Sequence, residues 1–144
     1  MYDVSIYTDG ACSGNPGAGG WAAILICNST TKEISGAEKE TTNNRMELMA
    51  VIEALSCIKY ESKITVYSDS AYVVNALTQG WLENWKKSNW RTSGKKEVLN
   101  RDLWKRLNVL LEKHNVTFQK VKGHADNAYN NRCDTLAREA IKTL

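Results

Sequence analysis

The chain has 144 residues, of which 42% are hydrophobic and 24% charged, and these values fit one globular domain with a hydrophobic core. No apolar stretch approaches the roughly 18 residues of a membrane span, and the start, MYDVSIYTDG, has neither the basic nor the apolar region of a signal peptide, so we expect no membrane contact and no export. The net charge of +3 is too small to indicate a nucleic-acid partner by itself.

The four cysteines are scattered along the chain without a CxxC pair: Cys12, Cys27, Cys57 and Cys133. This spacing suits neither a zinc site nor a disulfide framework, and it favours reduced thiols in the cytoplasm. The sequence shows no internal repeat, low-complexity tract or linker, so we expect a single domain over residues 1–144, and we expect it to be a monomer.

The first part of the chain predicts three strands followed by a helix. Alternating apolar residues indicate strands over 4–12, 21–28 and 32–40, with a loop at 14–20 (GNPGAGG) and a polar turn at 28–31. Short connections between consecutive strands are typical of an antiparallel meander. A helix over 43–58 follows, with threonine and asparagine at its start.

The rest of the chain alternates helices and strands. We predict a strand over 63–69, a helix with Ser70 as N-cap, an amphipathic helix over 100–115, a strand over 116–121 and a final helix over 130–144, whereas residues 81–98 fit no regular pattern. This order indicates an α/β fold, with helices packed on a sheet that is parallel in its later strands. In such sheets, sites gather at strand ends and adjoining helix starts.

One carboxylate lies on the unexpected face of the predicted helix 43–58. At about 100° per residue, Glu53 and Ser56 lie about 240° and 180° around the helix from Glu47, and as polar positions they mark the water-exposed face. Glu47 falls on the opposite side, among Val51 and other apolar residues. A lone charge in a core is costly, and no Lys or Arg lies on this face, so a basic residue from elsewhere or a bound cation must balance it.

Three aspartates stand near the ends of other elements: Asp9 on the first strand, Asp69 at the end of the fourth and Asp134 on the last helix. Each has an ordinary explanation, since Asp–Gly is a common turn pair, Asp beside Ser is a common N-cap, and Asp134 could pair with Arg138 one turn later. A cation explains all four acids together, because Mg²⁺ prefers oxygen ligands. Two such ions about 3.5–4 Å apart can stabilise both oxygens of a phosphoryl displacement.

Five blocks resemble the motifs of bacterial type 1 ribonuclease H, in the family's order and spacing: TDGACSGNPGAGG, TTNNRMELMAVIEAL, SDSAYV, GWLENWKKSNWRT and VKGHADN…NRCDTLAR. The resemblance covers essentially the whole chain. It implies a five-stranded mixed sheet with helices on both sides, and hydrolysis of the RNA strand of RNA/DNA hybrids with two metal ions, leaving 5′-phosphate and 3′-hydroxyl ends. The ions would be Mg²⁺, with Mn²⁺ as a substitute.

Carried over position by position, the family's carboxylates fall on Asp9, Glu47, Asp69 and Asp134, and its mobile catalytic histidine falls on His124. A histidine in a polar loop is usually just solvated, but its ordinary pKa near neutrality would also let it move protons. The resemblance favours the second role, in which His124 assists release of the leaving group or product.

Residues 80–98 hold all of the net charge, because their five positive and two negative side chains sum to +3. Trp81, Trp85 and Trp90 are interleaved with cations that include Lys86 and Lys87. In most proteins, tryptophans in such a segment pack into the core and the lysines are simply solvated. Here the concentration of net charge in one segment favours a nucleic-acid-binding surface, in which cations contact phosphates and indoles contact sugars and bases. The segment also resembles the family's basic protrusion, which grips the DNA strand.

Several polar residues would contact the hybrid by family match: Thr42 and Asn84 would hold a DNA phosphate, and Cys12, Asn15, Asn43 and Asn44 would contact the duplex, whose 2′-OH distinguishes RNA from DNA. Thr42, Asn43 and Asn44 also suit the N-cap of the helix, and both roles are compatible because helix N-termini bind phosphate. Ala71 and Glu40 depart from the family, which often has Gln and Arg there, and Lys39 could compensate.

Two other functions fit parts of the pattern. A non-catalytic hybrid-binding module would gain nothing from four carboxylates near phosphates. A DNA-cleaving nuclease of the same superfamily, such as a resolvase or integrase core, is disfavoured by the TTNNRMEL block and the basic tryptophan segment. A hybrid-specific endonuclease is therefore the preferred hypothesis.

Overall fold

The structure is a computed structural model that describes residues 2–92, 94–121 and 127–144. Its elements, in chain order, are β1 (Tyr2–Gly14), β2 (Gly17–Cys27), β3 (Thr30–Thr41), α1 (Asn43–Ser56), β4 (Ser62–Ser68), α2 (Ala71–Thr78), α3 (Trp81–Lys87), α4 (Arg101–Lys113), β5 (Asn115–Lys120) and α5 (Ala128–Ile141). The predicted order of strands and helices is confirmed.

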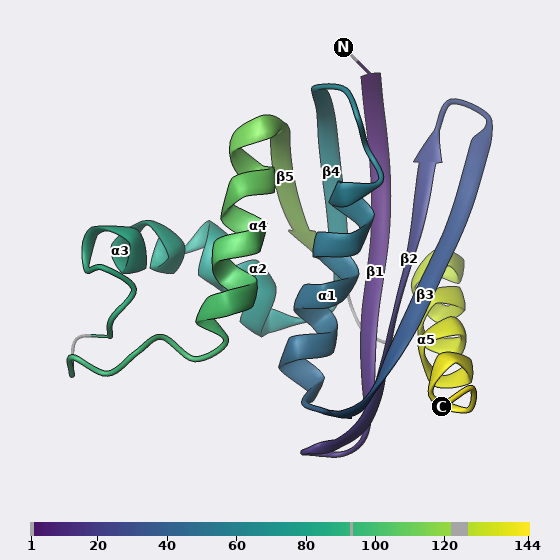
Figure 1. Ribbon diagram of the computed structural model, residues 1–144. Helices are drawn as coiled ribbons and strands as arrows, with labels where there is room; N and C mark the ends of the chain where they lie inside the picture. The colour runs from purple at the N-terminus through teal and green to yellow at the C-terminus, as the bar shows by residue number, and fades with distance from the viewer. Residues whose placement is uncertain (1, 93, 122–126) are drawn as a thin grey trace.

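The strands form one five-stranded sheet in the order β3-β2-β1-β4-β5 (Figure 1). β2 runs antiparallel to both β1 and β3, whereas β1, β4 and β5 are parallel. This confirms the expected mixed sheet. Tyr7 on β1 pairs with Tyr67 on β4, so Asp9 and Asp69, each two residues further along the chain, reach the same end of the sheet.

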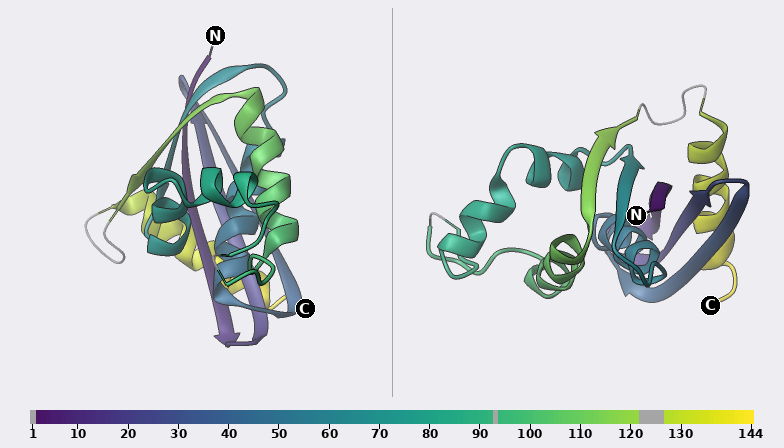
Figure 2. Two further views of the ribbon diagram at one scale, coloured as in Figure 1. Left: turned by 90° about the vertical axis from the view of Figure 1, so that its left-hand side faces the viewer. Right: turned by 90° about the horizontal axis from the view of Figure 1, so that it is seen from above.

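Helices cover both faces of the sheet, as expected (Figure 2). On one face, α1 and α4 share the larger core with β1 and β4, and this core includes Ile6, Leu48 and Trp104. On the other face, Cys133 and Ala137 of α5 pack against β2. α3 follows α2 and extends away from the sheet, at the end of the molecule opposite α5 (Figure 1). Among the described residues, no helix has the length and apolar character to cross a lipid bilayer.

The predicted loop at 14–20 is wrong for most of its length. β1 continues to Gly14 and β2 begins at Gly17, so only two residues form the turn. The glycines that follow serve packing: a Cβ on Gly19 would lie 2.5 Å from the Thr41 methyl carbon, and one on Gly20 would lie 2.1 Å from the Ala137 carbonyl oxygen. Sequence alone does not separate these two uses of glycine.

Several element ends also differ from the predictions. The last helix begins at Ala128 rather than 130, because the Asn127 side chain accepts a hydrogen bond from the Asn130 N–H (3.0 Å) and caps it. The helix predicted over 43–58 ends at Ser56, and Asp69 lies just beyond β4 rather than on it. The unplaced segment 81–98 contains α3, followed by irregular backbone.

Candidate active site

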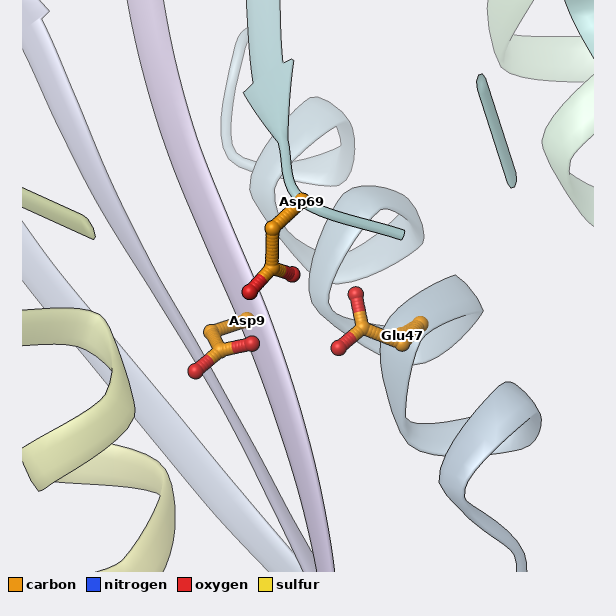
Figure 3. Close-up of side chains that lie close together, drawn as sticks. All are labelled: Asp9, Glu47 and Asp69. Atoms are coloured by element: carbon orange, nitrogen blue, oxygen red, sulfur yellow. The ribbon is translucent and has the colours of Figure 1, made fainter. Parts of the chain in front are cut away.

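Three carboxylates, from β1, from α1 and from the residue that follows β4, point toward one another (Figure 3). One oxygen each from Asp9, Glu47 and Asp69 lies within 4.8 Å of the others. Asp9 is 5% exposed and Glu47 3%, so the prediction that Glu47 faces away from water is confirmed. In the described part of the chain, no lysine or arginine forms an ion pair with any of the three.

Gly10 sets the close approach of α1 to β1. A Cβ at this position would lie 2.5 Å from the backbone nitrogen of Glu47, so a larger residue would push the helix away. The Gly10 N–H donates a hydrogen bond of 2.8 Å to Glu47 Oε1. The other oxygen, Oε2, is buried and has no hydrogen-bond partner among the described residues. A buried acceptor without a partner is unfavourable, so this oxygen is suited to a positive ligand.

The electrostatics of the three carboxylates also favour a bound cation. Burial, together with the charges of Asp69 and Asp134, raises the pKa of Asp9 from 3.8 to about 7. Burial and the charges of Asp9 and Asp69 raise the pKa of Glu47 well above its ordinary value. A bound cation would offset both pKa shifts, because a nearby opposite charge favours the ionised carboxylate.

Asp134 reaches the same place from α5. A cavity of about 380 Å³ is lined by Asp9, Gly10, Asn43, Asn44, Glu47, Asp69, Ser70, Ala71, Tyr72 and Asp134. We call it the acid cavity. Asp134 Oδ2 also lies 3.0 Å from Nη2 of Arg138. Both interpretations of Asp134 made from the sequence therefore apply: it forms an ion pair with Arg138, and it lines the same cavity as the other acids. His124 lies outside the described residues.

The start of α1 forms one border of the acid cavity. Thr42 is the N-cap, and its hydroxyl accepts a hydrogen bond of 3.2 Å from the Arg45 N–H. Asn15 Oδ1 accepts one of 3.2 Å from the Asn43 N–H and thereby ties the β1–β2 turn to the helix. The Cys12 thiol lies 3.5 Å from the Thr41 carbonyl oxygen. Asn43 and Asn44 thus line the acid cavity, with Cys12, Asn15 and Thr42 around the start of α1, and the binding role of all five stays a prediction.

A second cavity lies on α3, with a volume of about 400 Å³, and we call it the α3 cavity. It is lined by Trp81, Asn84, Trp85, Ser88, Arg91 and Thr92. Trp81 is 37% exposed, whereas Trp85 packs on Trp104 with ring centroids 5.3 Å apart. Trp90 is partly buried, and Lys105 Nζ lies 5.8 Å from its ring centroid. The tryptophans therefore combine both roles weighed from the sequence, core packing and exposed surface.

Sequence reasoning assigned no individual role to two residues that line the acid cavity, Gly10 and Tyr72. Gly10 directly follows Asp9 in the TDGA block. Tyr72 gave no local signal, because it reads as an apolar helix residue and its hydroxyl partners, Asn100 and Trp104, are distant in sequence. Only the fold brings these side chains together.

The chain is similar in sequence and in structure to proteins of one known family. The family model of RNase H matches residues 1–142. Ribonuclease H of Chlorobium chlorochromatii (strain CaD3) is 61% identical over 139 residues, which are 96% of this chain and 95% of that protein. The crystal structure of LC9-RNase H1, described as a type 1 RNase H with the type 2 active-site motif, matches with a TM-score of 0.89 and 30% identity over 99% of this chain and 74% of that one. LC11-RNase H1, solved in complex with an RNA/DNA hybrid, matches with a TM-score of 0.72 and 25% identity over 97% of both chains.

Proposed function

Because the chain belongs to the RNase H family, we propose that it is an endonuclease that hydrolyses the RNA strand of RNA/DNA hybrids. The observation that carries this proposal is the cluster of Asp9, Glu47 and Asp69, whose buried Glu47 Oε2 has no partner in the described chain. The name of the Chlorobium relative supports the activity, and the hybrid bound to LC11-RNase H1 supports the substrate.

The donor set fits a hard divalent cation. The three clustered donors, found among residues 2–92, 94–121 and 127–144, are carboxylate oxygens, which suit Mg²⁺ or Mn²⁺ better than softer metals. Asp9, Glu47 and Asp69 would hold the metal, with Asp134 completing the set from α5. Two ions bound here with substrate would stabilise negative charge on the attacking and leaving oxygens. Four carboxylates would in turn offset the charge of two divalent ions.

The hydrolysis exchanges one phosphorus–oxygen bond for another. A water oxygen forms the new bond to phosphorus, the bond to the 3′ oxygen breaks, and the phosphate stays on the 5′ end of the downstream fragment. The 3′ oxygen takes up a proton and leaves as a hydroxyl. His124, assigned by family match, is the side chain that we propose for this proton, because histidine in general can donate a proton near neutral pH.

Substrate choice would come from the borders of the acid cavity and from α3. Asn43 and Asn44 line the acid cavity at the start of α1, where amides and backbone N–H groups suit a 2′-OH or a phosphate. Cys12 and Asn15 would contact the hybrid beside them, and Thr42 and Asn84 would hold a DNA phosphate. The indoles of Trp81, Trp85 and Trp90 and the cations Lys86 and Lys87 would contact the DNA strand. We also propose that the protein acts as a monomer in the cytoplasm.

The test is cleavage of an end-labelled RNA/DNA hybrid with Mg²⁺, beside the same RNA as a single strand, RNA/RNA and DNA/DNA. We expect cuts only in the RNA of the hybrid, 3′-hydroxyl and 5′-phosphate ends, and loss of cutting with chelator or in Asp9→Asn. Tight hybrid binding without cutting would instead indicate a binding module. Cutting of DNA/DNA would indicate a DNA nuclease.

A further inference from the structure

We propose that Tyr72 is a positioning residue that fixes the spacing between the acid cavity and the α3 cavity, so that one hybrid is held in register at both. The proposal rests on the proposed function, because it assumes that the duplex contacts both cavities. Tyr72 lines the acid cavity from the first turn of α2, and the residues that bind its hydroxyl lie at the start of α4, close to the α3 cavity.

The Tyr72 hydroxyl has fixed partners on α4 and just before it. It accepts hydrogen bonds from Trp104 Nε1 (3.0 Å) and Asn100 Nδ2 (3.1 Å), and it lies 3.5 Å from the Leu99 carbonyl oxygen. A phenol has one donor and two acceptor sites, so these contacts occupy all of them. The hydroxyl is therefore not available for proton transfer in the acid cavity, and Tyr72 acts through its position.

Asn100 connects this group to the helix that carries Glu47. Its Oδ1 accepts a hydrogen bond of 3.3 Å from Arg45 Nη1, and the same guanidinium binds both oxygens of Asp102 at 3.0 and 2.8 Å. Arg45 lies in the first turn of α1, two residues before Glu47. Asn100 itself has φ 62°, a left-handed conformation that asparagine adopts more readily than most residues. The contacts join α1, α2 and the start of α4.

Trp104 continues the connection to the α3 cavity. Its ring lies 5.5 Å from that of Tyr72 and 5.3 Å from that of Trp85, and Trp85 lies 6.5 Å from Trp81. Trp104 is fully buried, so it cannot shift without disturbing the core. An unbroken series of packed rings thus runs from the wall of the acid cavity to the wall of the α3 cavity.

The test uses Tyr72→Phe, which keeps the ring and removes the hydroxyl. Steady-state cleavage and cut positions are measured on a long end-labelled hybrid and on the shortest hybrid that the wild-type protein still cuts. On the long hybrid we expect KM to rise about five-fold with little change in kcat, since two donors lose their acceptor and α3 is held less firmly. We expect cuts to spread to neighbouring positions, and no change in KM on the short hybrid.

Asn100→Gly is the second variant, because glycine keeps the left-handed backbone while the side-chain hydrogen bonds to Tyr72 and Arg45 are lost. It should show the same dependence on hybrid length, so the proposal remains testable if one variant folds poorly. The matched control is Tyr60→Phe, an exposed tyrosine before β4, at the opposite end of that strand from Asp69. Urea unfolding of each variant monitors stability.

Unchanged KM and cut positions in both variants would overturn the proposal, as would an equal loss of kcat/KM on long and short hybrids, which is the mark of a purely structural role. These outcomes are distinct from a failure of the proposed function, in which the wild-type protein itself would not cut the hybrid.

Discussion

Glu47 illustrates how a side chain that weakens a fold can serve a site. Its carboxylate is buried beside two others, one oxygen accepts the Gly10 N–H, and the second has no partner among the described residues. Burial, followed by repulsion from the charges of Asp9 and Asp69, raises the pKa of Glu47 well above its ordinary value. Without a cation, the three clustered carboxylates destabilise the folded state. When a cation is bound, the same carboxylates would be its ligands.

Glu47→Gln should therefore stabilise the metal-free protein. The amide oxygen can still accept the Gly10 N–H, its NH₂ can donate to Asp9 or Asp69, and repulsion between the acids falls. We expect the free energy of unfolding at pH 8 with chelator to rise by about 1 kcal/mol, as for one unit of relieved pKa shift. Urea unfolding measures this change.

Glu53→Gln is the matched control on the same helix. Glu53 is half-buried and lies 3.5 Å from Arg106 Nη2, so its loss should cost less than about 1 kcal/mol, and the protein should not become more stable. Mg²⁺ should raise the melting temperature of the wild-type protein and of Glu53→Gln, but not that of Glu47→Gln. Equal metal stabilisation of all three proteins would contradict the assignment of Glu47.

Asp9 predicts how stability depends on pH. Its pKa is raised from 3.8 to about 7 in the folded, metal-free protein, mainly by burial. Between these values the folded state retains a proton that the unfolded state releases, so the free energy of unfolding should fall by up to about 1.4 kcal/mol per pH unit as pH rises from 4 to 7. Urea unfolding with chelator, repeated across this range, measures the slope.

Asp9→Asn should make that slope shallower, whereas Asp3→Asn, at an exposed position on the same strand, should leave it unchanged. Saturating Mg²⁺ should also flatten it in the wild-type protein, because the metal displaces the protons. A slope that is the same in Asp9→Asn would show that the protons reside elsewhere.

At the scale of elements, helix positions decide where the acids meet. α5 lies so close to the sheet that a Cβ on Gly20 would come within 2.1 Å of the Ala137 carbonyl oxygen. Asp134 stands one turn before Ala137 on the same helix. Gly20 thus allows α5, which carries the fourth carboxylate, to lie close to the sheet.

Gly20→Ala should push α5 outward. The clashing atom belongs to the α5 backbone, which cannot move as freely as a side chain, so we expect the free energy of unfolding to fall by about 1–3 kcal/mol. We also expect slower cleavage, because Asp134 would move together with α5. Gly94→Ala is the control, since its Cβ would meet nothing nearer than Thr92 Oγ1 at 3.8 Å, and it should stay within about 0.5 kcal/mol of wild type. Urea unfolding measures both variants, and equal stability would show that the helix adapts without cost.

The elements themselves were largely predictable, because strands with alternating residues and helices with a clear apolar face carry their signal locally. Glu47 stood out for the same reason, as a charge on an apolar face. The glycines in the segment 17–20 were misread, since the atoms that exclude a Cβ there belong to distant residues: the side chains of Thr41 and Met46 at Gly19, and the Ala137 backbone at Gly20. The contacts of Tyr72 were missed because they join residues about 30 positions apart.

At the scale of the whole molecule, the positive charge that would bind the hybrid and the acids that would bind metal lie in different parts of the chain. Residues 80–98 carry the entire net charge of +3, and α3 within them extends from the sheet, away from α5 (Figure 2). The acids gather at the sheet. A hybrid bound by its phosphates along α3 would release counterions, so its affinity should fall with salt.

The two lysines at the end of α3 should differ in this effect. Lys87 is exposed, whereas Lys86 Nζ already lies 3.4 Å from Glu83 and 3.8 Å from Glu112. Lys87→Gln should reduce the slope of log affinity against log salt by about 0.9, and Lys86→Gln should reduce it less. Hybrid binding is measured by fluorescence anisotropy in the Asp9→Asn background, which prevents cutting. Lys142→Gln, at the C-cap of α5, is the control and should leave the slope unchanged.

The most direct test of the proposed chemistry is the single-turnover rate of hybrid cleavage by Glu47→Gln at saturating Mg²⁺. Removing even a residue that supports a metal ligand costs about 10–100-fold, so loss of a ligand should lower the rate by more than about 100-fold while hybrid affinity stays close to wild type. A rate near that of the wild-type protein would contradict the assignment of the buried carboxylates as the metal site.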